Sequence, residues 1–177
     1  GSEMCIRDRM KTICWLLAAL MFWAGSVSAQ TLEEDGESGL KLPRFVSLRS
    51  NQINARSGPG ARYPIEWVYM QKGAPVEIIA EFEIWRQIKD WQGSKTWVHK
   101  TMLSGHRSVK VMTPGENNIY AKADYNSKVI AKVEDEVIGD ILKCPEGSPF
   151  CQIKFERITG WVPRQNLYGL YPQEVID

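Results

Sequence analysis

The sequence predicts an all-β protein made of two tandem copies of a small β module, preceded by an N-terminal signal peptide and a short flexible lead-in. The composition is that of a globular chain, because 44% of its 177 residues are hydrophobic and 24% are charged. Beyond residue 44 no stretch keeps a helical period. Hydrophobic residues instead fall in short β-prone runs, about 8 to 12 residues apart, with turn residues between them. Segments of the first half return in the second half, which indicates an internal repeat.

The first 44 residues divide into three segments that precede the β modules. Residues 1–9 (GSEMCIRDR) show no periodicity and stand ahead of an internal methionine, so we interpret them as a non-native leader. Residues 10–29 have a positive start, a short apolar run and a small-residue end, which is the layout of a cleaved signal peptide. The run is shorter than the roughly 20 residues of a spanning helix, so no stable membrane span is expected. Residues 30–44 are rich in acid, Gly and Ser and predict a flexible lead-in, with the mature protein starting near Gln30 in the periplasm or outside the cell.

Three pairs of matching segments define the two copies. QIK at 87–89 returns at 152–154, TWVHKTMLSG at 96–105 returns as GWVPRQNLYG at 160–169, and INARSGPGARYPI at 53–65 returns as IYAKADYNSKVI at 119–130. The pairs keep their order at offsets of 64 to 66 residues, so we expect one module over residues 45–105 and a diverged second one over 112–172. Because a module of this size is only marginally stable alone, we expect the two copies to pack on each other.

Two cysteines remain once the predicted leader and signal peptide are removed. Cys144 and Cys151 lie on either side of the turn-rich segment PEGSPF, and two cysteines in an oxidising compartment usually pair. We therefore expect a disulfide between them, with two small buried thiols as the alternative. In the chain-entropy model such a short loop contributes roughly 2 to 3 kcal/mol.

Within the predicted mature chain, net positive charge is confined to the first module. Residues 30–40 carry four acids and no base, residues 41–105 carry ten Lys or Arg against five acids, and residues 106–177 carry nine against ten. The basic first module suits an anionic surface such as the cell wall, or it is an ordinary solvated face. A nucleic-acid-binding protein would show a clustered basic stripe and a net charge well above zero, so nucleic acid is not an expected partner.

A set of motifs in the first copy resembles the bacterial SH3-like domain. The set consists of NARSGP at 54–59, Tyr63-Pro64, the turn Lys72-Gly73 ahead of PVEII at 75–79, Trp85 at the start of a strand, Trp97-Val98 and Leu103-Ser104. The resemblance covers residues 45–105 well and residues 112–170 more loosely. It implies a small β-barrel that serves exported bacterial proteins as a non-catalytic module contacting peptidoglycan or peptides.

Gly58, Pro59 and Gly60 are expected to form a turn. A phosphate-binding loop needs successive backbone N–H donors and a following helix, but Pro59 removes a donor and no helical pattern follows. In a type II turn, Pro59 would take the first central position and Gly60 the second, with φ above zero. The second copy has KADY at 122–125 where the first has RSGP at 56–59, so its loop is expected to bend differently.

No catalytic residue, metal site or cofactor is predicted. A thiol hydrolase needs a free cysteine with a histidine to activate it, but the two cysteines of the second copy are expected to pair with each other. The sequence contains no Gly-x-Ser-x-Gly motif. His99 and His106 have no cysteine nearby, whereas a metal site needs at least three ligands.

Candidate ligand-binding residues come from the aromatic and basic side chains of the first copy. In WRQIKD (85–90) the apolar Ile88 should point inward, which places Trp85 on the polar face of the strand. A bulge would reverse this, so surface and core positions both stay open for Trp85. Trp91 lies in a polar turn with little reason to be buried, whereas Trp97 is expected in the core. The candidate ligand-binding set is Arg56, Arg62, Tyr63, Trp67, Trp85 and Trp91.

These features predict an exported, non-catalytic protein that binds a peptide or a cell-wall (peptidoglycan) ligand. Tyr63, Trp67 and Trp85 would offer ring faces to an extended ligand, and Arg56 and Arg62 would bind its carboxylates. Two alternatives stay open. One is a structural or adaptor protein of the periplasm that binds a protein partner, and the other is a cell-wall hydrolase. The sequence defines neither the ligand nor the oligomeric state.

Overall fold

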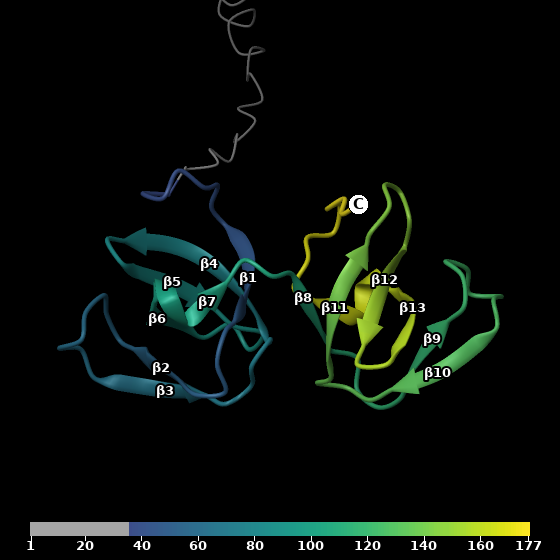
Figure 1. Cartoon of the computed structure of the whole chain (residues 1–177), viewed down its shortest axis with the longest axis horizontal. Coiled ribbons are helices and arrows are strands. Elements are labelled where there is room, and N and C mark those ends of the chain that lie inside the picture. The colour runs from purple at the N-terminus through teal and green to yellow at the C-terminus, as the bar shows by residue number, and fades with distance from the viewer. Residues whose placement is uncertain (1–35) are drawn as a thin grey trace, which may run out of the picture. The chain divides into compact units, whose positions relative to one another are not determined.

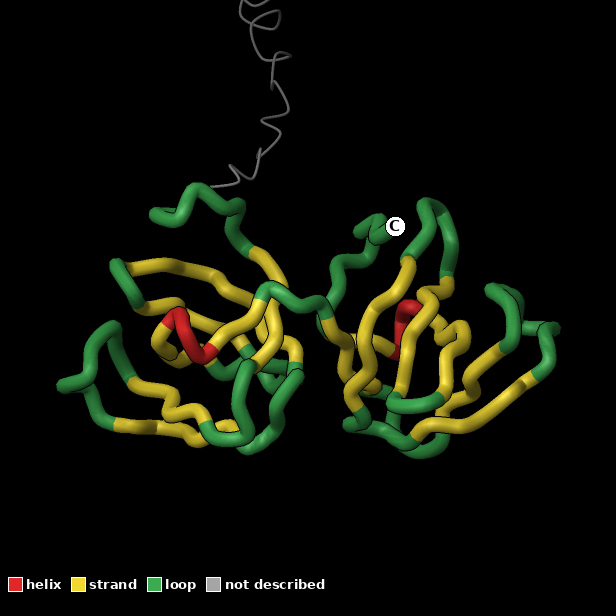
Figure 2. The backbone as a smooth tube through the Cα atoms, viewed as in Figure 1, coloured by secondary structure: helices red, strands yellow, loops and turns green. Residues whose placement is uncertain are grey.

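The computed structural model describes residues 36–177, which form two seven-stranded antiparallel sheets and no α-helix (Figure 1). Strands and connecting loops alternate along the whole of this range (Figure 2). The all-β prediction is confirmed. The predicted leader, the predicted signal peptide and the start of the lead-in lie outside the described residues. Within residues 36–177, no helix has the length and apolar character needed to cross a membrane.

The first domain contains seven strands and one 3-10 helix. Its elements are β1 (Arg44–Leu48), β2 (Ile53–Arg56), β3 (Ile65–Tyr69), β4 (Pro75–Phe82), β5 (Trp85–Lys89), β6 (Lys95–His99), η1 (Lys100–Met102) and β7 (Leu103–Ser104). Neighbouring strands follow the order β3-β2-β6-β5-β4-β1-β7. Every strand contributes a buried side chain to one hydrophobic core, so the sheet must curve around that core.

The second domain repeats this topology. Its elements are β8 (Ser108–Val111), β9 (Asn117–Tyr120), β10 (Val129–Val133), β11 (Ile138–Lys143), β12 (Phe150–Phe155), β13 (Ile158–Pro163), η2 (Arg164–Asn166) and β14 (Leu167–Tyr168). The strand order is β10-β9-β13-β12-β11-β8-β14, which is the order of the first sheet with seven added to each number. Strand β8 lies ahead of residue 112, where the sequence repeat placed the start of the second copy, because none of the matching segments includes it.

A disulfide joins Cys144 and Cys151 and closes the loop between β11 and β12. The Cα atoms of the two residues are 4.4 Å apart, and both side chains are fully buried in the second core. Cys144 also exchanges two backbone hydrogen bonds with Ile176, at 2.7 and 3.0 Å. The C-terminal tail is therefore tied to the same point as the loop.

The described part of the lead-in makes hydrogen bonds to the first domain. The backbone N–H and hydroxyl of Ser38 both donate to the carboxylate of Glu81, at 2.7 and 2.9 Å. Arg44 and Arg86 form ion pairs with the same carboxylate. The backbone N–H of Glu83, at the β4–β5 turn, donates to the carboxylate of Glu37. Residues 37 and 38 thus have defined partners at the end of the β4–β5 hairpin.

The two domains belong to one compact unit, and aromatic rings fill part of the contact between them. Phe45 of β1 lies 5.3 Å from the ring of Tyr168 and 4.9 Å from that of Tyr171, measured between centroids. The hydroxyl of Tyr171 donates to Glu77, and the hydroxyl of Tyr168 donates to the backbone carbonyl of Lys89. Burial and the nearby charge of Glu77 raise the pKa of both tyrosines, so both remain neutral donors.

Lys110 of β8 fills the other part of the contact. Its side chain is almost fully buried, and its Nζ lies 3.8 Å from the ring centroid of Trp91 in the first domain. Nζ also donates to the side-chain oxygen of Gln71 at 3.4 Å and lies 3.8 Å from the carboxylate of Glu136. Burial lowers the pKa of Lys110, and the charge of Glu136 opposes that shift. The amine is therefore held by a ring, an amide and a carboxylate together.

Replacing Lys110 by Ala should lower the free energy of unfolding by about 2 kcal/mol, since it removes a desolvated cation–π contact and the packing of the aliphatic stem. The exposed Lys128 is the matched control, and Lys128→Ala should change stability by less than about 0.5 kcal/mol. Denaturant unfolding of both variants measures the difference. Equal losses would show that the buried amine contributes nothing to the contact.

Acid should weaken the link between the tail and the interdomain segment. Arg107 binds the carboxylate of Glu174 at 2.6 and 2.9 Å. Burial raises the pKa of Glu174, but the hydrogen bonds from Arg107 and from the Tyr171 N–H outweigh it and hold the pKa below its ordinary value of 4.5. A carboxylate with a lowered pKa stabilises the fold fully above that ordinary value, and this contribution is lost as pH falls through the lowered value.

The variant Glu174→Gln should therefore be less stable than the parent chain at pH 7, and the gap should shrink as the pH drops below 4.5. Denaturant unfolding at a series of pH values measures the gap. Glu134→Gln, at an exposed position, is the control and should show no gap at any pH. A gap for Glu174→Gln that does not vary with pH would contradict the assignment.

Candidate functional site

Aromatic and basic side chains of the first domain form a row across three strands. Arg56 of β2 pairs with Trp97 of β6, and Trp97 pairs with Gln87 of β5. Further along the same strands Trp85 pairs with His99, with ring centroids 5.7 Å apart and planes perpendicular. All five side chains are half-buried. We call Arg56, Trp85, Gln87, Trp97 and His99 the outer face of the first sheet.

Strand alternation explains why these side chains point outward. Ile88 of β5 and Val98 of β6 are fully buried in the core, so their neighbours along each strand point to the other side. Of the two positions left open for Trp85, the outward one is observed. The expected core position of Trp97 is wrong, because Trp97 directly precedes the buried Val98.

Three backbone hydrogen bonds close the loop between β2 and β3. They run from the N–H of Ser57 to Pro64, from Gly60 to Gly58 and from Tyr63 to Gly60, at 3.1, 2.9 and 3.2 Å. The bond from Gly60 to Gly58 spans two residues and makes a γ-turn about Pro59. Gly60 does not have the positive φ that a type II turn requires, so the expected turn type is wrong, although the three residues do form a turn.

Gly58 is required by the ring of Tyr63. A Cβ at residue 58 would lie 2.5 Å from that ring, closer than any side chain tolerates. Arg56 donates a hydrogen bond to the carbonyl of Tyr63 at 2.7 Å, and the guanidinium of Arg62 lies 5.4 Å from the ring centroid. Tyr63 is thus held by a glycine below it and by two arginines beside it.

The corresponding loop of the second domain bends in the same way, and the expectation that it differs is wrong. Its hydrogen bonds run from the N–H of Ala121 to Lys128, from Asp124 to Lys122 and from Ser127 to Asp124. Each bond lies 64 residues beyond its counterpart, whereas the sequence comparison had used an offset of 66 at this point. Lys122 therefore occupies the place of Gly58, and Ser127 that of Tyr63. The small Ser127 leaves room for Lys122 and accepts a hydrogen bond from its N–H at 3.0 Å.

Trp67 and Trp91 lie apart from the outer face. Trp67 pairs with the core-facing Ala55, so its ring lies on the same side of the sheet as Ala55 and not on the outer face. The ring is 54% exposed because β3 is an edge strand. Trp91 packs against the first core, 6.2 Å from the ring of Tyr69 and below Lys110. The six candidate residues therefore do not form one surface. Arg56 and Trp85 lie on the outer face, Arg62 and Tyr63 lie in the β2–β3 loop, and Trp67 and Trp91 lie elsewhere.

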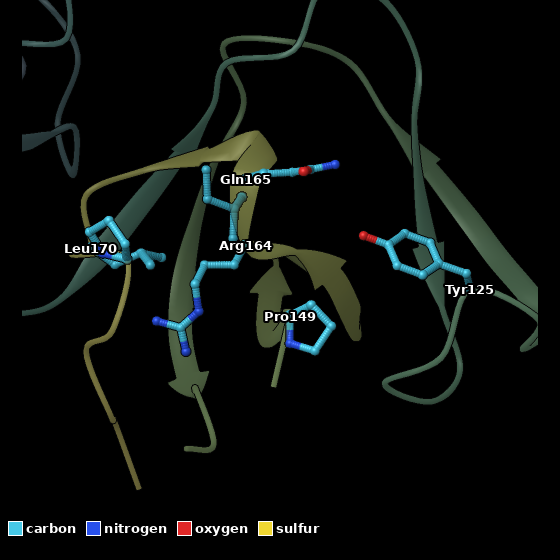
Figure 3. A pocket seen from close by; sticks show the side chains of 7 residues that line it. Tyr125, Pro149, Arg164, Gln165 and Leu170 are labelled. Carbon is cyan, nitrogen blue, oxygen red and sulfur yellow. The ribbon is translucent and has the colours of Figure 1, made fainter. Parts of the chain in front are cut away.

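The second domain contains a cavity of about 470 Å³ that none of the residues predicted from the sequence lines. Figure 3 shows Tyr125 on one side of it and Arg164 and Leu170 on the other. Pro149, in the loop of residues 144–149 between β11 and β12, lines the cavity, whereas the corresponding β4–β5 turn of the first domain has only residues 83 and 84. In the sequence, the only sign of this cavity is the extra length of this loop between two segments that otherwise match the first copy.

Both histidines have side-chain partners. His99 Nδ1 lies 2.7 Å from the hydroxyl of Thr101, and its ring also accepts from the Thr101 N–H at the start of η1. His106 Nε2 lies 2.9 Å from the carboxylate of Asp140. In the part of the chain that the structure describes, no three His, Cys, Asp or Glu side chains are grouped as metal ligands.

Comparison with known proteins identifies the first domain. Residues 49–105, which make up most of the first domain, match the family described as the bacterial SH3 domain. The match ends at residue 105. The fold is therefore of the SH3-like class, as the sequence motifs predicted.

Two structures from Trichomonas vaginalis are similar to the chain. NlpC2 has 17% identity over 71% of this chain and 48% of its own, and NlpC1 has 15% identity over 78% and 49%, each with a TM-score of 0.32. The aligned part thus spans about half the length of both proteins. At this level of similarity neither carries an inference about activity. No curated protein matches the chain.

Substitution of Gly58 by Ala should lower stability by about 1–3 kcal/mol, because the new methyl group overlaps the Tyr63 ring. Adding Tyr63→Ser should recover part of that loss, since the second domain combines Lys122 with Ser127. Gly105→Ala is the control, because no atom lies within 4 Å of a Cβ at that position. Thermal and denaturant unfolding test the cycle. Strict additivity of the Gly58 and Tyr63 changes would contradict a direct clash.

Proposed function

We propose that the protein is an exported, non-catalytic binding protein that recognises a peptide or cell-wall ligand through the outer face of its first domain. The observation that carries the proposal is the row formed by Arg56, Trp97 and Trp85. Indole rings offer broad apolar surface with one N–H donor each, and a guanidinium binds carboxylates in a fixed geometry. An extended peptide crossing the strands would meet rings and a cation in turn.

The β2–β3 loop would border this binding surface. Arg62 is exposed and its guanidinium lies against the ring of Tyr63. It can therefore bind an anionic group without first breaking an ion pair within the protein. The ligand class in this proposal is therefore a peptide with free carboxylates, such as the stem peptides of the cell wall. Export to the periplasm or the medium is part of the same proposal, because it places the protein where that ligand occurs.

Binding of the purified chain to cell-wall sacculi at low and high salt tests the proposal. Trp85→Ala and Arg62→Ala should each weaken binding about tenfold, which corresponds to roughly 1.4 kcal/mol. Lys128→Ala should leave it unchanged. Binding that largely survives at high salt would indicate recognition by the rings rather than attraction to a basic surface. The proposal would be rejected if the parent chain did not bind sacculi, or if Trp85→Ala and Arg62→Ala both bound as tightly as the parent chain.

A second candidate function is that of an adaptor for a protein partner, and the edge strand β3 favours it. Ile65, Trp67 and Val68 are 47%, 54% and 39% exposed and border a shallow hollow of about 370 Å³. Exposed apolar side chains on a sheet edge are typical of protein contacts. Cross-linking in cells that captures one protein partner with the parent chain, and loses it with Trp67→Ala, would favour this function.

A further inference from the structure

The cavity of the second domain is built from three separate segments. Its lining residues are Tyr125, Pro149, Arg164, Gln165, Leu167, Leu170 and Pro172. Tyr125 comes from the β9–β10 loop, Pro149 from the loop closed by the disulfide, and the others from η2, β14 and the C-terminal tail (Figure 3). A smaller hollow of about 230 Å³ shares Pro149, Arg164 and Pro172 with it. The two hollows therefore meet at Arg164.

The walls of the cavity are fixed by contacts behind them. The ring of Tyr125 lies 4.6 Å from that of the buried Phe150, measured between centroids. The backbone carbonyl of Pro149 accepts a hydrogen bond from the Arg164 N–H at 2.8 Å. Leu170 belongs to the core of the second domain. A cavity with walls held in this way costs little ordering when a ligand enters.

Arg164 brings a positive charge to this apolar cavity. Its Nη1 donates to the backbone carbonyls of Tyr171 and Glu174, at 3.2 and 2.8 Å. The carboxylate of Glu174 forms its ion pair with Arg107, although the charge of Arg164 also helps to lower the pKa of Glu174. Among the described residues, Nη2 and Nε of Arg164 make no hydrogen bond. Two donors of a half-buried guanidinium are thus available to an anion.

We propose that this cavity is a second binding site, which takes the carboxyl-terminal end of a peptide with an apolar last residue. The carboxylate would bind Nη2 and Nε of Arg164 as a bidentate pair. The apolar side chain would lie between Tyr125 and Pro149, and the amide of Gln165 would reach the peptide backbone. The volume of about 470 Å³ is within the range of small-ligand sites and accommodates a few residues rather than a folded partner.

The first domain has a hollow of about 350 Å³ lined by Lys100 and Leu103 among others, but it lacks the parts proposed here for binding. In the first domain Lys100 occupies the place of Arg164, at the usual offset of 64, and the two-residue turn at 83–84 provides no counterpart to Pro149. The C-terminal tail that supplies Leu170 and Pro172 has no counterpart either, because the chain continues from β7 into β8. This proposal is therefore independent of the outer face of the first domain and does not rest on its function.

Titration of the full chain with N-acetyl-prolyl-leucine, followed by NMR of the backbone amides, tests the proposal. The free acid should shift amides of residues 121–128, 146–151 and 164–172, whether or not the outer face of the first domain also responds. At these residues the matched carboxamide, which lacks the charge, should bind at least tenfold more weakly. Equal binding of acid and amide there, or no shift of these residues at millimolar acid, would overturn the proposal.

Two variants locate the site by affinity. Tyr125→Ala removes a ring that is 53% exposed, so the fold should survive while affinity for the free acid falls at least fivefold. Arg164→Lys keeps the charge but loses the bidentate geometry, and the preference for acid over amide should shrink. Ile158→Ala, exposed at the far end of the β12–β13 hairpin, should bind as the parent chain does. Unchanged affinity of Tyr125→Ala would exclude this cavity as the site.

Discussion

Lys110 brings a charged amine into the contact between the two domains, where it lies against the ring of Trp91 with almost no exposure to water. A lone buried amine is costly, so Gln71 and Glu136 must stay within reach of it. That requirement fixes the first domain and β8 against each other. Each domain is small enough to be marginal alone, and the contact supplies burial that neither core provides. Strand β8, which carries Lys110, pairs with β11 and β14, so the contact connects directly to the second sheet.

The C-terminal tail links the domain contact to the cavity. Tyr168 and Tyr171 face Phe45 and Glu77 of the first domain, while Leu170, between them, faces the second core. Carbonyls of the same tail hold Arg164. A short segment therefore has one set of partners in each domain, and the orientation of the guanidinium depends on the domains remaining together.

Much of the fold follows from the sequence, and the reasons are local. The alternation around Ile88 predicts the strand, although it leaves both the surface and the core position open for Trp85, and the repeated segments predict two related sheets. The position of Trp97 was missed because its bulk suggested a core residue, although the buried Val98 beside it decides the matter. The type II turn is wrong because a glycine at residue 60 suggests a positive φ that the backbone does not adopt. Gly58 is required for another reason, the ring of Tyr63, which lies five residues further on.

The candidate sites were harder to predict because their parts are distant in the sequence. Arg56 and Trp97 meet only through strand pairing, and Tyr125 and Arg164 meet only once two loops and the tail converge. The search for a binding site also favoured the copy nearest to the family pattern. The cavity instead lies in the second copy, and it is lined by the longer loop and the C-terminal tail, which are the segments that differ from the first copy.

Gly58 with Tyr63, and Lys122 with Ser127, are two solutions to one spatial constraint. In each pair one residue is small and the other is large, with the larger residue at opposite positions in the two loops. In related chains these two positions should therefore covary, so that a glycine accompanies an aromatic residue and a larger residue accompanies a small one. A graft of either loop between the domains would have to carry both positions together.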